Sequence, residues 1–377
     1  MRFSLRDVLT ILFVVQVVGV AGIVNHLHQR SERQSIALLT QDLMRTTGDR
    51  IDSYLSDYLE TPQLINAQTV DAITSGELDL TNLVQVEQHL YRQMANHLHI
   101  STVLYGSPDG TFRLVHRNVL DGNQLEGGRS NPSNPAELTI YRLNSIREWG
   151  DRLEVLSDFD VRDRPWYRAA IRDRQTGWTP PFQIGQDPSL VINTYQPIYD
   201  ETTGALNAVV AVNLSLLDLS QFLNTIDIVD QGAIAIVDAD GYIVATSTDE
   251  VPFWIEADGR LRRRSMDESQ AAAIAHIAEL ADGSSPLTIG NQPLHNNNSD
   301  YFVYAKSIDP RFQLDWTVVV AISKSVYLDD VNAAQRTTTI YVAMITLLML
   351  LISAGVSRWI LRPLRELRDG AHHLSRY

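Results

Sequence analysis

The amino-acid sequence predicts an α+β fold: a long N-terminal stalk helix, then two tandem antiparallel-sheet modules, flanked by two transmembrane helices. Three patterns support this fold: an uncharged apolar segment near each end, a helical stripe after the first, and a strand–turn–strand arrangement that occurs twice. The predicted segments are 1–7 (cytoplasmic), 8–27 (first transmembrane helix), 28–60 (stalk helix), 61–224 (membrane-distal module), 225–336 (membrane-proximal module), 337–357 (second transmembrane helix) and 358–377 (amphipathic tail).

Composition excludes several classes of function. The 377 residues carry a net charge of −14 and no basic stripe, so we expect no nucleic-acid partner. The chain has no cysteine, which excludes a disulfide scaffold, a thiolate zinc site and a thiol nucleophile. This composition is compatible with an exported bacterial domain.

Both apolar segments are long enough to cross a bilayer, because a spanning helix needs about 20 apolar residues. Val8–Leu27 and Thr337–Ser357 contain no charged residue. No Ala-x-Ala cleavage site follows the first segment, so we interpret it as an uncleaved anchor. Arginines lie before the first segment and after the second, which predicts cytoplasmic termini and an extracytoplasmic domain in a bacterial inner membrane. These arginines are Arg2, Arg6, Arg358, Arg362, Arg365 and Arg368.

Hydrophobic periodicity predicts the remaining elements. The stalk helix carries an apolar stripe at steps of three and four, and we expect it to end near Pro62. A second helix is predicted from Leu83 to Leu98. Strands are predicted at 101–105, 111–116, 138–143, 152–156, 190–199, 208–214, 232–237, 242–246, 301–308 and 314–322. Shorter helices are predicted at 166–172, 216–223 and 267–280.

The most distinctive stretch runs from Asp158 to Tyr167 and places Arg164, Trp166 and Tyr167 around a proline. Pro165 suits the first turn of a helix, so this cluster is expected where a strand gives way to a helix. An arginine fork matches a carboxylate, and the two aromatic rings supply walls. The alternative is that the two aromatics belong to the core and Arg164 pairs with Asp160 or Asp163.

The sequence gives no sign of catalysis, a metal or a cofactor. Asp238–Gly241 resembles the start of a calcium loop, but the later acidic ligands are missing and a hairpin turn is predicted instead. His97 and His99 have no evident carboxylate companion for a metal. No nucleophile elbow, phosphate loop or zinc-protease helix occurs, so we expect a sensor portion and no enzyme.

The C-terminal segment resembles the start of a HAMP linker, whose first helix follows a membrane span and carries a Pro-Leu pair. Here that pair is Pro363-Leu364, in an amphipathic stretch that begins at Arg358. A seam of Ile360, Leu364, Leu367 and Leu374 is available for helix packing. The alternative is a free-standing amphipathic tail.

The whole order resembles the double CACHE sensor proteins of bacterial membranes, specifically the dCACHE_1 type, which have two PAS-like modules. The Arg-x-Trp-Tyr element (Arg164, Trp166, Tyr167) is similar to the signature of the membrane-distal pocket in the amino-acid-binding branch of that family. The resemblance implies that these side chains contact the ligand carboxylate, and that other residues hold the ammonium group.

Carried over residue by residue, the resemblance departs on the ammonium side. Phe159 stands where a tyrosine is expected, and Phe182 stands for the next aromatic. The acidic position two residues later is Ile184, and the final aspartate is Asn213. An ammonium without a countercharge is unfavourable in a buried site, so we expect a small carboxylate or other small anion. An empty, purely structural distal module is the alternative.

The resemblance implies a homodimeric transmembrane receptor. Ligand binding is expected to bias the dimer and to pass through the second membrane helix into the HAMP linker. The output domain is missing from this sequence and is a histidine kinase, a nucleotide cyclase or a chemoreceptor signalling helix. Two alternatives stay open: a truncated receptor that acts as a dimerisation or scaffold partner, and a membrane-tethered extracytoplasmic enzyme.

The first prediction concerns topology. A periplasm-active reporter fused near Asn213 should be active, whereas the same reporter fused near Arg365 should be silent, because the flanking arginines orient both spans. External protease applied to intact spheroplasts should cleave only the region between the spans. Cleavage near Arg365 together with protection of Asn213 contradicts this topology.

Overall fold

The protein is described here by a computed structural model of the chain. The described residues are 5–118, 122–131, 133–146, 148–184, 189–226, 232–280, 301–324 and parts of 340–355. Most side chains of the first predicted span, about half of the second span, and the whole predicted HAMP segment lie outside the described residues. Within the described part of the chain, we find no helix that combines the length and apolar character required to cross a membrane.

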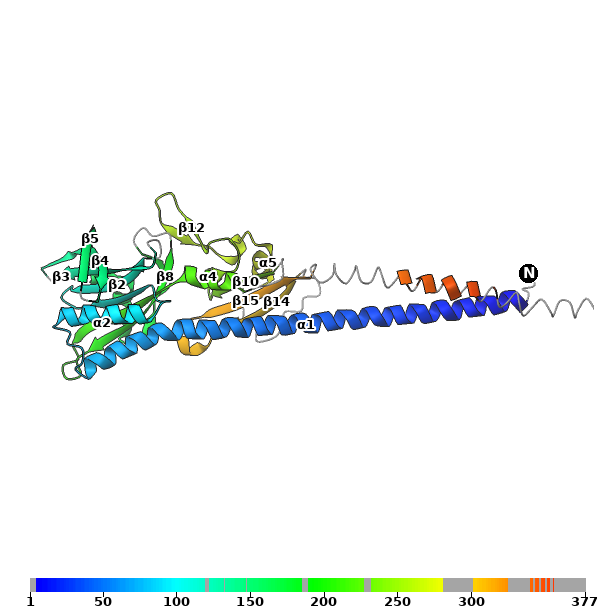
Figure 1. Cartoon of the computed structure of the whole chain (residues 1–377), viewed down its shortest axis with the longest axis horizontal. Helices are drawn as coiled ribbons and strands as arrows, with labels where there is room; N and C mark the ends of the chain where they lie inside the picture. The colour runs from blue at the N-terminus through cyan, green and yellow to red at the C-terminus, as the bar shows by residue number, and fades with distance from the viewer. Residues whose placement is uncertain are drawn as a thin grey trace, which may run out of the picture. The chain divides into compact units, whose positions relative to one another are not determined.

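The chain separates into two compact units, Met1–Leu43 with Ser323–Tyr377, and Met44–Ile322. The second unit contains both sheets. The predicted combination of a long N-terminal helix with antiparallel sheets is confirmed (Figure 1).

The N-terminal helix α1 runs from Leu5 to Thr74, so the prediction that it ends near Pro62 is wrong. Proline lacks the N–H that would bond to the carbonyl four residues earlier, which usually ends or kinks a helix. Here the turn beyond Pro62 is held by packing, because Ile65 and Asn66 are 0% and 1% exposed. Nδ2 of Asn66 also donates to the backbone oxygen of Thr194, at 3.3 Å. Tertiary contact therefore outweighs the missing hydrogen bond.

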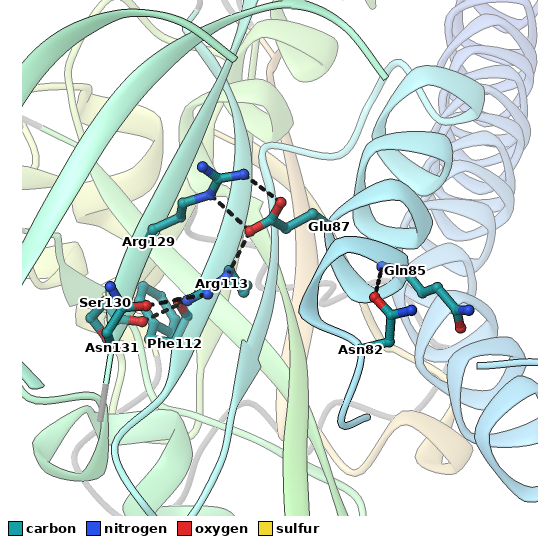
Figure 2. A network of polar contacts seen from close by, with 8 residues as sticks. All are labelled: Asn82, Gln85, Glu87, Phe112, Arg113, Arg129, Ser130 and Asn131. Carbon is teal, nitrogen blue, oxygen red and sulfur yellow. Dashed lines mark hydrogen bonds and ion pairs between the residues drawn. The ribbon is translucent and has the colours of Figure 1, made fainter. Parts of the chain in front are cut away.

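Helix α2 spans Leu83–Asn96 and follows the predicted periodicity. The side chain of Asn82 accepts a hydrogen bond from the backbone N–H of Gln85 and caps the N-terminus (Figure 2). Its buried face consists of Val86, Glu87, Leu90 and Met94. This face packs on β1 and β2, and α2 lies along the same side of the sheet as the C-terminal part of α1 (Figure 1).

The larger sheet has nine antiparallel strands. Its order is β5-β4-β3-β2-β1-β9-β8-β6, and β7 also pairs with β8. The bounds are Thr102–Gly106 (β1), Phe112–Asn118 (β2), Gln124–Asn131 (β3), Asn134–Ser145 (β4), Glu148–Ser157 (β5), Gly177–Trp178 (β6), Phe182–Gln183 (β7), Leu190–Tyr199 (β8) and Leu206–Ser215 (β9).

Strand β3 was not predicted, because its sequence is polar and contains two glycines. The structure explains those glycines by close packing. An added Cβ at Gly127 would lie 2.6 Å from the ring of Trp149, and one at Gly128 would lie 2.8 Å from Leu114. A larger residue at either position would therefore require these neighbouring side chains to move.

Side chains alternate between two faces of this sheet, which we call the α2 face and the α3 face. On the α3 face, helix α3 (Pro165–Asp173) covers Leu104, Val209 and Ala211. The further members of this core are Phe112, Leu138, Ile140, Val161, Trp166, Tyr167, Ala169, Ala170 and Tyr195.

Two tyrosines of this core, Tyr167 and Tyr195, differ in the hydrogen bonding of their hydroxyl groups. The Tyr195 hydroxyl donates to a carboxylate oxygen of Asp173, at the end of α3. The Tyr167 hydroxyl is buried and has no hydrogen-bond partner among the described residues. Burial raises the pKa of both Tyr167 and Tyr195 to about 12, so both stay protonated at neutral pH.

The α2 face carries a charged cluster of Glu87, Arg113 and Arg129, shown in Figure 2, in which Glu87 and Arg113 are buried. Glu87 Oε1 accepts from Nε of Arg113 and from Nε of Arg129, each at 2.8 Å. Glu87 Oε2 lies 2.5 Å from Nη2 of Arg129. Burial lowers the pKa of Arg113, and the adjacent Glu87 carboxylate opposes that change. The cluster fixes α2 to β2 and β3.

The second sheet has four strands in the order β11-β10-β15-β14. Helices α4 and α5 and a separate hairpin of β12 and β13 accompany it. The bounds are Leu216–Asn224 (α4), Gly232–Asp238 (β10), Ile243–Thr246 (β11), Phe253–Ile255 (β12), Leu261–Arg263 (β13), Ala272–Leu280 (α5), Tyr301–Ser307 (β14) and Trp316–Ser323 (β15). The helix predicted at 267–280 is divided into a 3-10 turn, Met266–Glu268, and α5.

Glu87→Ala should strongly destabilise the domain, because it leaves Arg113 buried at 5% side-chain exposure without its countercharge. The expected loss is about 3–5 kcal/mol. Arg168→Ala is the matched control, since its pair with Asp163 is 70% and 62% exposed and should contribute less than about 1 kcal/mol. Urea unfolding of the purified chain, followed by tryptophan fluorescence, measures both. Similar losses in the two variants contradict a structural role for the buried cluster.

Tyr167→Phe should leave the stability unchanged or raise it, because it removes a buried hydroxyl without a partner among the described residues. Tyr195→Phe should cost about 1.5 kcal/mol, since it removes a hydrogen bond to a carboxylate. The same urea titration compares these two isosteric changes. A larger loss for Tyr167→Phe than for Tyr195→Phe shows that the Tyr167 hydroxyl has a partner.

Candidate ligand-binding site

Arg164 lies at the start of α3 and is half-buried. Its Nε donates to the backbone oxygen of Asp160 at 3.1 Å, and its guanidinium carbon lies 5.0 Å from the centre of the Phe159 ring. Among the described residues, Arg164 forms no ion pair. The alternative pairing with Asp160 or Asp163 is therefore absent from this part of the chain.

Neighbouring arginines occupy both of those carboxylates. Arg162 Nη2 lies 2.7 Å from Asp160 Oδ2, and Arg168 Nη2 lies 3.2 Å from Asp163 Oδ1. The hydrogen bond from Arg162 is the main cause that lowers the pKa of Asp160 and keeps it ionised.

Local structure explains the position of Arg164. Asp160 caps a short 3-10 turn at Val161–Asp163, since its side chain accepts from the backbone N–H of Arg162 at 2.9 Å. Pro165 then occupies the first turn of α3, as predicted. Arg164 therefore stands between two helical turns, with extended backbone at φ −72° and ψ 145°. The chain bends there and carries the guanidinium past the Phe159 ring.

Trp166 and Tyr167 are core residues, 3% and 1% exposed. Their rings meet edge to face at 5.6 Å, and Trp166 lies 6.4 Å from the ring of Phe112. A Cβ added to Gly106 on β1 would lie 3.1 Å from Trp166 and 3.2 Å from Tyr167. The two aromatics therefore form a wall that lies directly on the sheet.

A row of polar side chains crosses the α3 face beside this apolar core. In register, the row consists of Asn193 (β8), Asn213 (β9), Thr102 (β1), His116 (β2), Glu126 (β3) and Arg142 (β4). Thr102 is two residues from Leu104, so its side chain shares the α3 face. We call these six residues the polar row.

Four members of the polar row are buried: Asn193, Asn213, Thr102 and Glu126. Nδ2 of Asn193 donates to Oδ1 of Asn213. Glu126 Oε1 accepts from Nδ2 of Asn118 at 2.9 Å, and its Oε2 lies 2.9 Å from Nε2 of His116. The single carboxylate of the row is therefore already engaged.

The remaining predicted residues lie beside this row. Phe182 on β7 pairs with Val191, which is two residues from Asn193, so the Phe182 ring shares the α3 face. Ile184, which follows β7, is 39% exposed. The structure thus places Arg164, Phe159, Trp166 and Tyr167 around α3, and Phe182 and Asn213 at the polar row.

Sequence reasoning missed Asn193, Thr102, His116 and Glu126 as neighbours of Asn213. Each is a polar residue within a strand, which is a weak signal by itself. Alternation indicates which residues of one strand share a face. Which residues of different strands become neighbours depends on the register between the strands, which the sequence does not show.

The side chain of Gln183, which follows Phe182, contacts the β12–β13 hairpin. Nε2 of Gln183 donates to the backbone oxygen of Gly259 at 3.2 Å, and Oε1 of Gln183 accepts from the backbone N–H of Leu261 at 3.1 Å. The side-chain amide thereby bonds to the β12–β13 hairpin as a strand backbone does.

The other motifs have structural explanations. Asp238–Gly241 is a turn between β10 and β11, where Asp238 Oδ1 accepts from Tyr242 N–H at 3.0 Å and Arg263 pairs with Asp238 at 2.6 Å. The described residues contain no group of three or more side chains that could hold a metal. His97 and His99 line a cavity of about 430 Å³ beside α1.

The chain is similar to part of a curated chemotaxis protein. A segment of 93 residues is 34% identical to the methyl-accepting chemotaxis protein McpA of Pseudomonas putida. That match covers 25% of this chain and 14% of the relative, so the chain spans a small part of the curated relative's length.

Matches among solved structures include two chemoreceptor ligand-binding domains, each with a TM-score below 0.5. That of Campylobacter jejuni Tlp3, in complex with 4-methylisoleucine, has 13% identity and a TM-score of 0.46, and the match covers 76% of this chain and 90% of that one. That of the Pseudomonas aeruginosa amino acid chemoreceptor PctC, in complex with GABA, has 17% identity and a TM-score of 0.46, with 75% and 100% covered.

The family comparison covers both sheets and the site. The model of the dCache_1 family, described as a Cache domain, matches residues 28–331. A match to a Cache domain agrees with the predicted sensor portion. Because the match extends over far more than half of the 377 residues, the chain belongs to the dCache_1 family of Cache sensory domains, which confirms the predicted family.

Proposed function

We propose that this chain is the sensor portion of a bacterial transmembrane receptor, and that its distal module binds a small carboxylate or another small anion. Arg164 supplies the charge, Phe159 and Trp166 supply walls, and Tyr167, Phe182 and Asn213 complete the site. The receptor is a homodimer in the inner membrane, with spans at 8–27 and 337–357 and with both termini in the cytoplasm.

The observation that carries this proposal is the environment of Arg164. A half-buried guanidinium normally pairs with a carboxylate, and both nearby aspartates pair with other arginines. Only Nε of Arg164 is engaged within the described residues, and it bonds to a backbone carbonyl. Its two terminal nitrogens are therefore suited to a bidentate anion.

Two contacts support transmission of binding beyond the nine-stranded sheet. The first is the bond pair between Gln183, beside Phe182, and the β12–β13 hairpin. The second connects β14 to α1, because Nζ of Lys306 lies 3.1 Å from Asp49 Oδ1 and 3.0 Å from Asp52 Oδ2. A Cβ on Gly48 would lie 2.5 Å from the ring of Tyr304, so β14 packs directly against the helix.

From there the proposed path follows the second membrane helix into a HAMP linker and an output domain. A membrane domain of this family without an output could also act as a dimerisation or scaffold partner. The apolar, uncharged character of both spans supports the two-pass arrangement.

Arg164→Ala should abolish most of the ligand-induced rise in melting temperature and leave the unliganded domain folded. Hydrogen bonds to a charged group contribute about 1.5–3 kcal/mol, so affinity should fall about ten- to a hundredfold. Thermal unfolding of the purified chain with a panel of carboxylates and amino acids measures this effect. Arg162→Ala is the matched control, because its guanidinium pairs with Asp160.

Three outcomes contradict the proposal. Arg164→Ala could unfold the chain without ligand, which would make this arginine structural. Standard amino acids could stabilise the wild type as strongly as any carboxylate, which would overturn the inference from Ile184 and Asn213. Equal losses in the Arg162 and Arg164 variants would remove the specific role of Arg164.

A further inference from the structure

The α3 face contains a buried pair of side-chain amides, Asn193 and Asn213, at 0% and 2% exposure. One hydrogen bond joins them, from Nδ2 of Asn193 to Oδ1 of Asn213. A side-chain amide has one acceptor oxygen and one NH₂ donor group. The pair therefore retains Oδ1 of Asn193 and Nδ2 of Asn213 for further bonds.

These remaining groups are not used by the described residues. Oδ1 of Asn193 is buried and receives no hydrogen bond within this part of the chain. A buried polar atom without a partner is unfavourable and is rare in native structures. Exchanging the oxygen and nitrogen positions in both amides leaves the same inventory of one acceptor and one donor. The position is therefore suited to a group that both donates and accepts.

The charge around the amide pair is unfavourable for an ammonium group. The neighbouring side chain in the polar row is Thr102, which is neutral. The nearest carboxylate of the row, Glu126, is already held by Asn118 and His116. An ammonium at the amide pair would therefore find no free carboxylate among the described members of the polar row, whereas a neutral group needs none.

We infer that the Asn193–Asn213 pair is a second recognition point of the ligand site and selects a neutral hydroxyl or carboxamide group on a carboxylate ligand. This inference rests on the proposed function, because Arg164 binds the carboxylate. Phe182 contributes an apolar wall beside the pair, on the same face. The amide pair then distinguishes hydroxy- and carboxamide-bearing acids from amino acids.

The test measures the melting temperature and affinity of the full chain in detergent. The ligands are carboxylates of increasing chain length, each carrying a methyl, hydroxyl, carboxamide or ammonium group at the same carbon atom. The hydroxyl or carboxamide member should bind about tenfold more tightly than its methyl partner, and the ammonium member most weakly. Asn213→Asp should shift the preference toward the ammonium member. Asn144→Asp, which adds the same charge at an exposed position of β4, should not.

The outcomes separate this inference from the proposed function. If carboxylates bind but the hydroxyl, carboxamide and methyl members are equal, the amide pair has no role in selection and only this inference fails. If the ammonium members bind best to the wild type, the inference is likewise overturned. If no carboxylate binds, both proposals fail. The wild-type series decides even if Asn213→Asp does not fold.

Discussion

The alternation of side chains along the nine-stranded sheet is the constraint on which the rest of the described domain depends. In β1, Tyr105 is in register with Arg113 and faces α2, whereas Leu104 lies in the core beneath α3. The charged cluster and the proposed ligand site are therefore on opposite faces of the same sheet. A shift of one residue would exchange the two sets, so the register determines where charge is buried.

The arginines on the two faces differ in burial and in pairing. Arg113 on the α2 face is buried and paired with Glu87, so it holds α2 to the sheet. Arg164 on the α3 side is half-buried and has no carboxylate partner among the described residues. A paired, buried arginine contributes structure, and an unpaired, accessible one is available to an anion. This contrast supports the proposal that Arg164 binds the anion, independently of its place in a motif.

Polar contacts also connect the β12–β13 hairpin and β14 to other elements of the domain. Gln183 bonds to the backbone of the β12–β13 hairpin, and Lys306 joins β14 to α1. Both connections start from residues that sequence alone does not distinguish from ordinary surface residues. The first joins the region beside Phe182 to the β12–β13 hairpin, and the second joins β14 to the long helix.

The sequence by itself determined the features that depend on neighbouring residues. Periodicity predicted α2, alternation predicted β8 at 190–199, and Pro165 predicted the start of α3. Only the tertiary structure decided that α1 continues past Pro62, because packing of distant residues stabilises that turn. It also decided that Asn193 lies beside Asn213, since 20 residues separate them in the chain. Strand pairing sets such contacts, and pairing depends on the whole core, whereas helix and turn signals depend on residues a few positions apart.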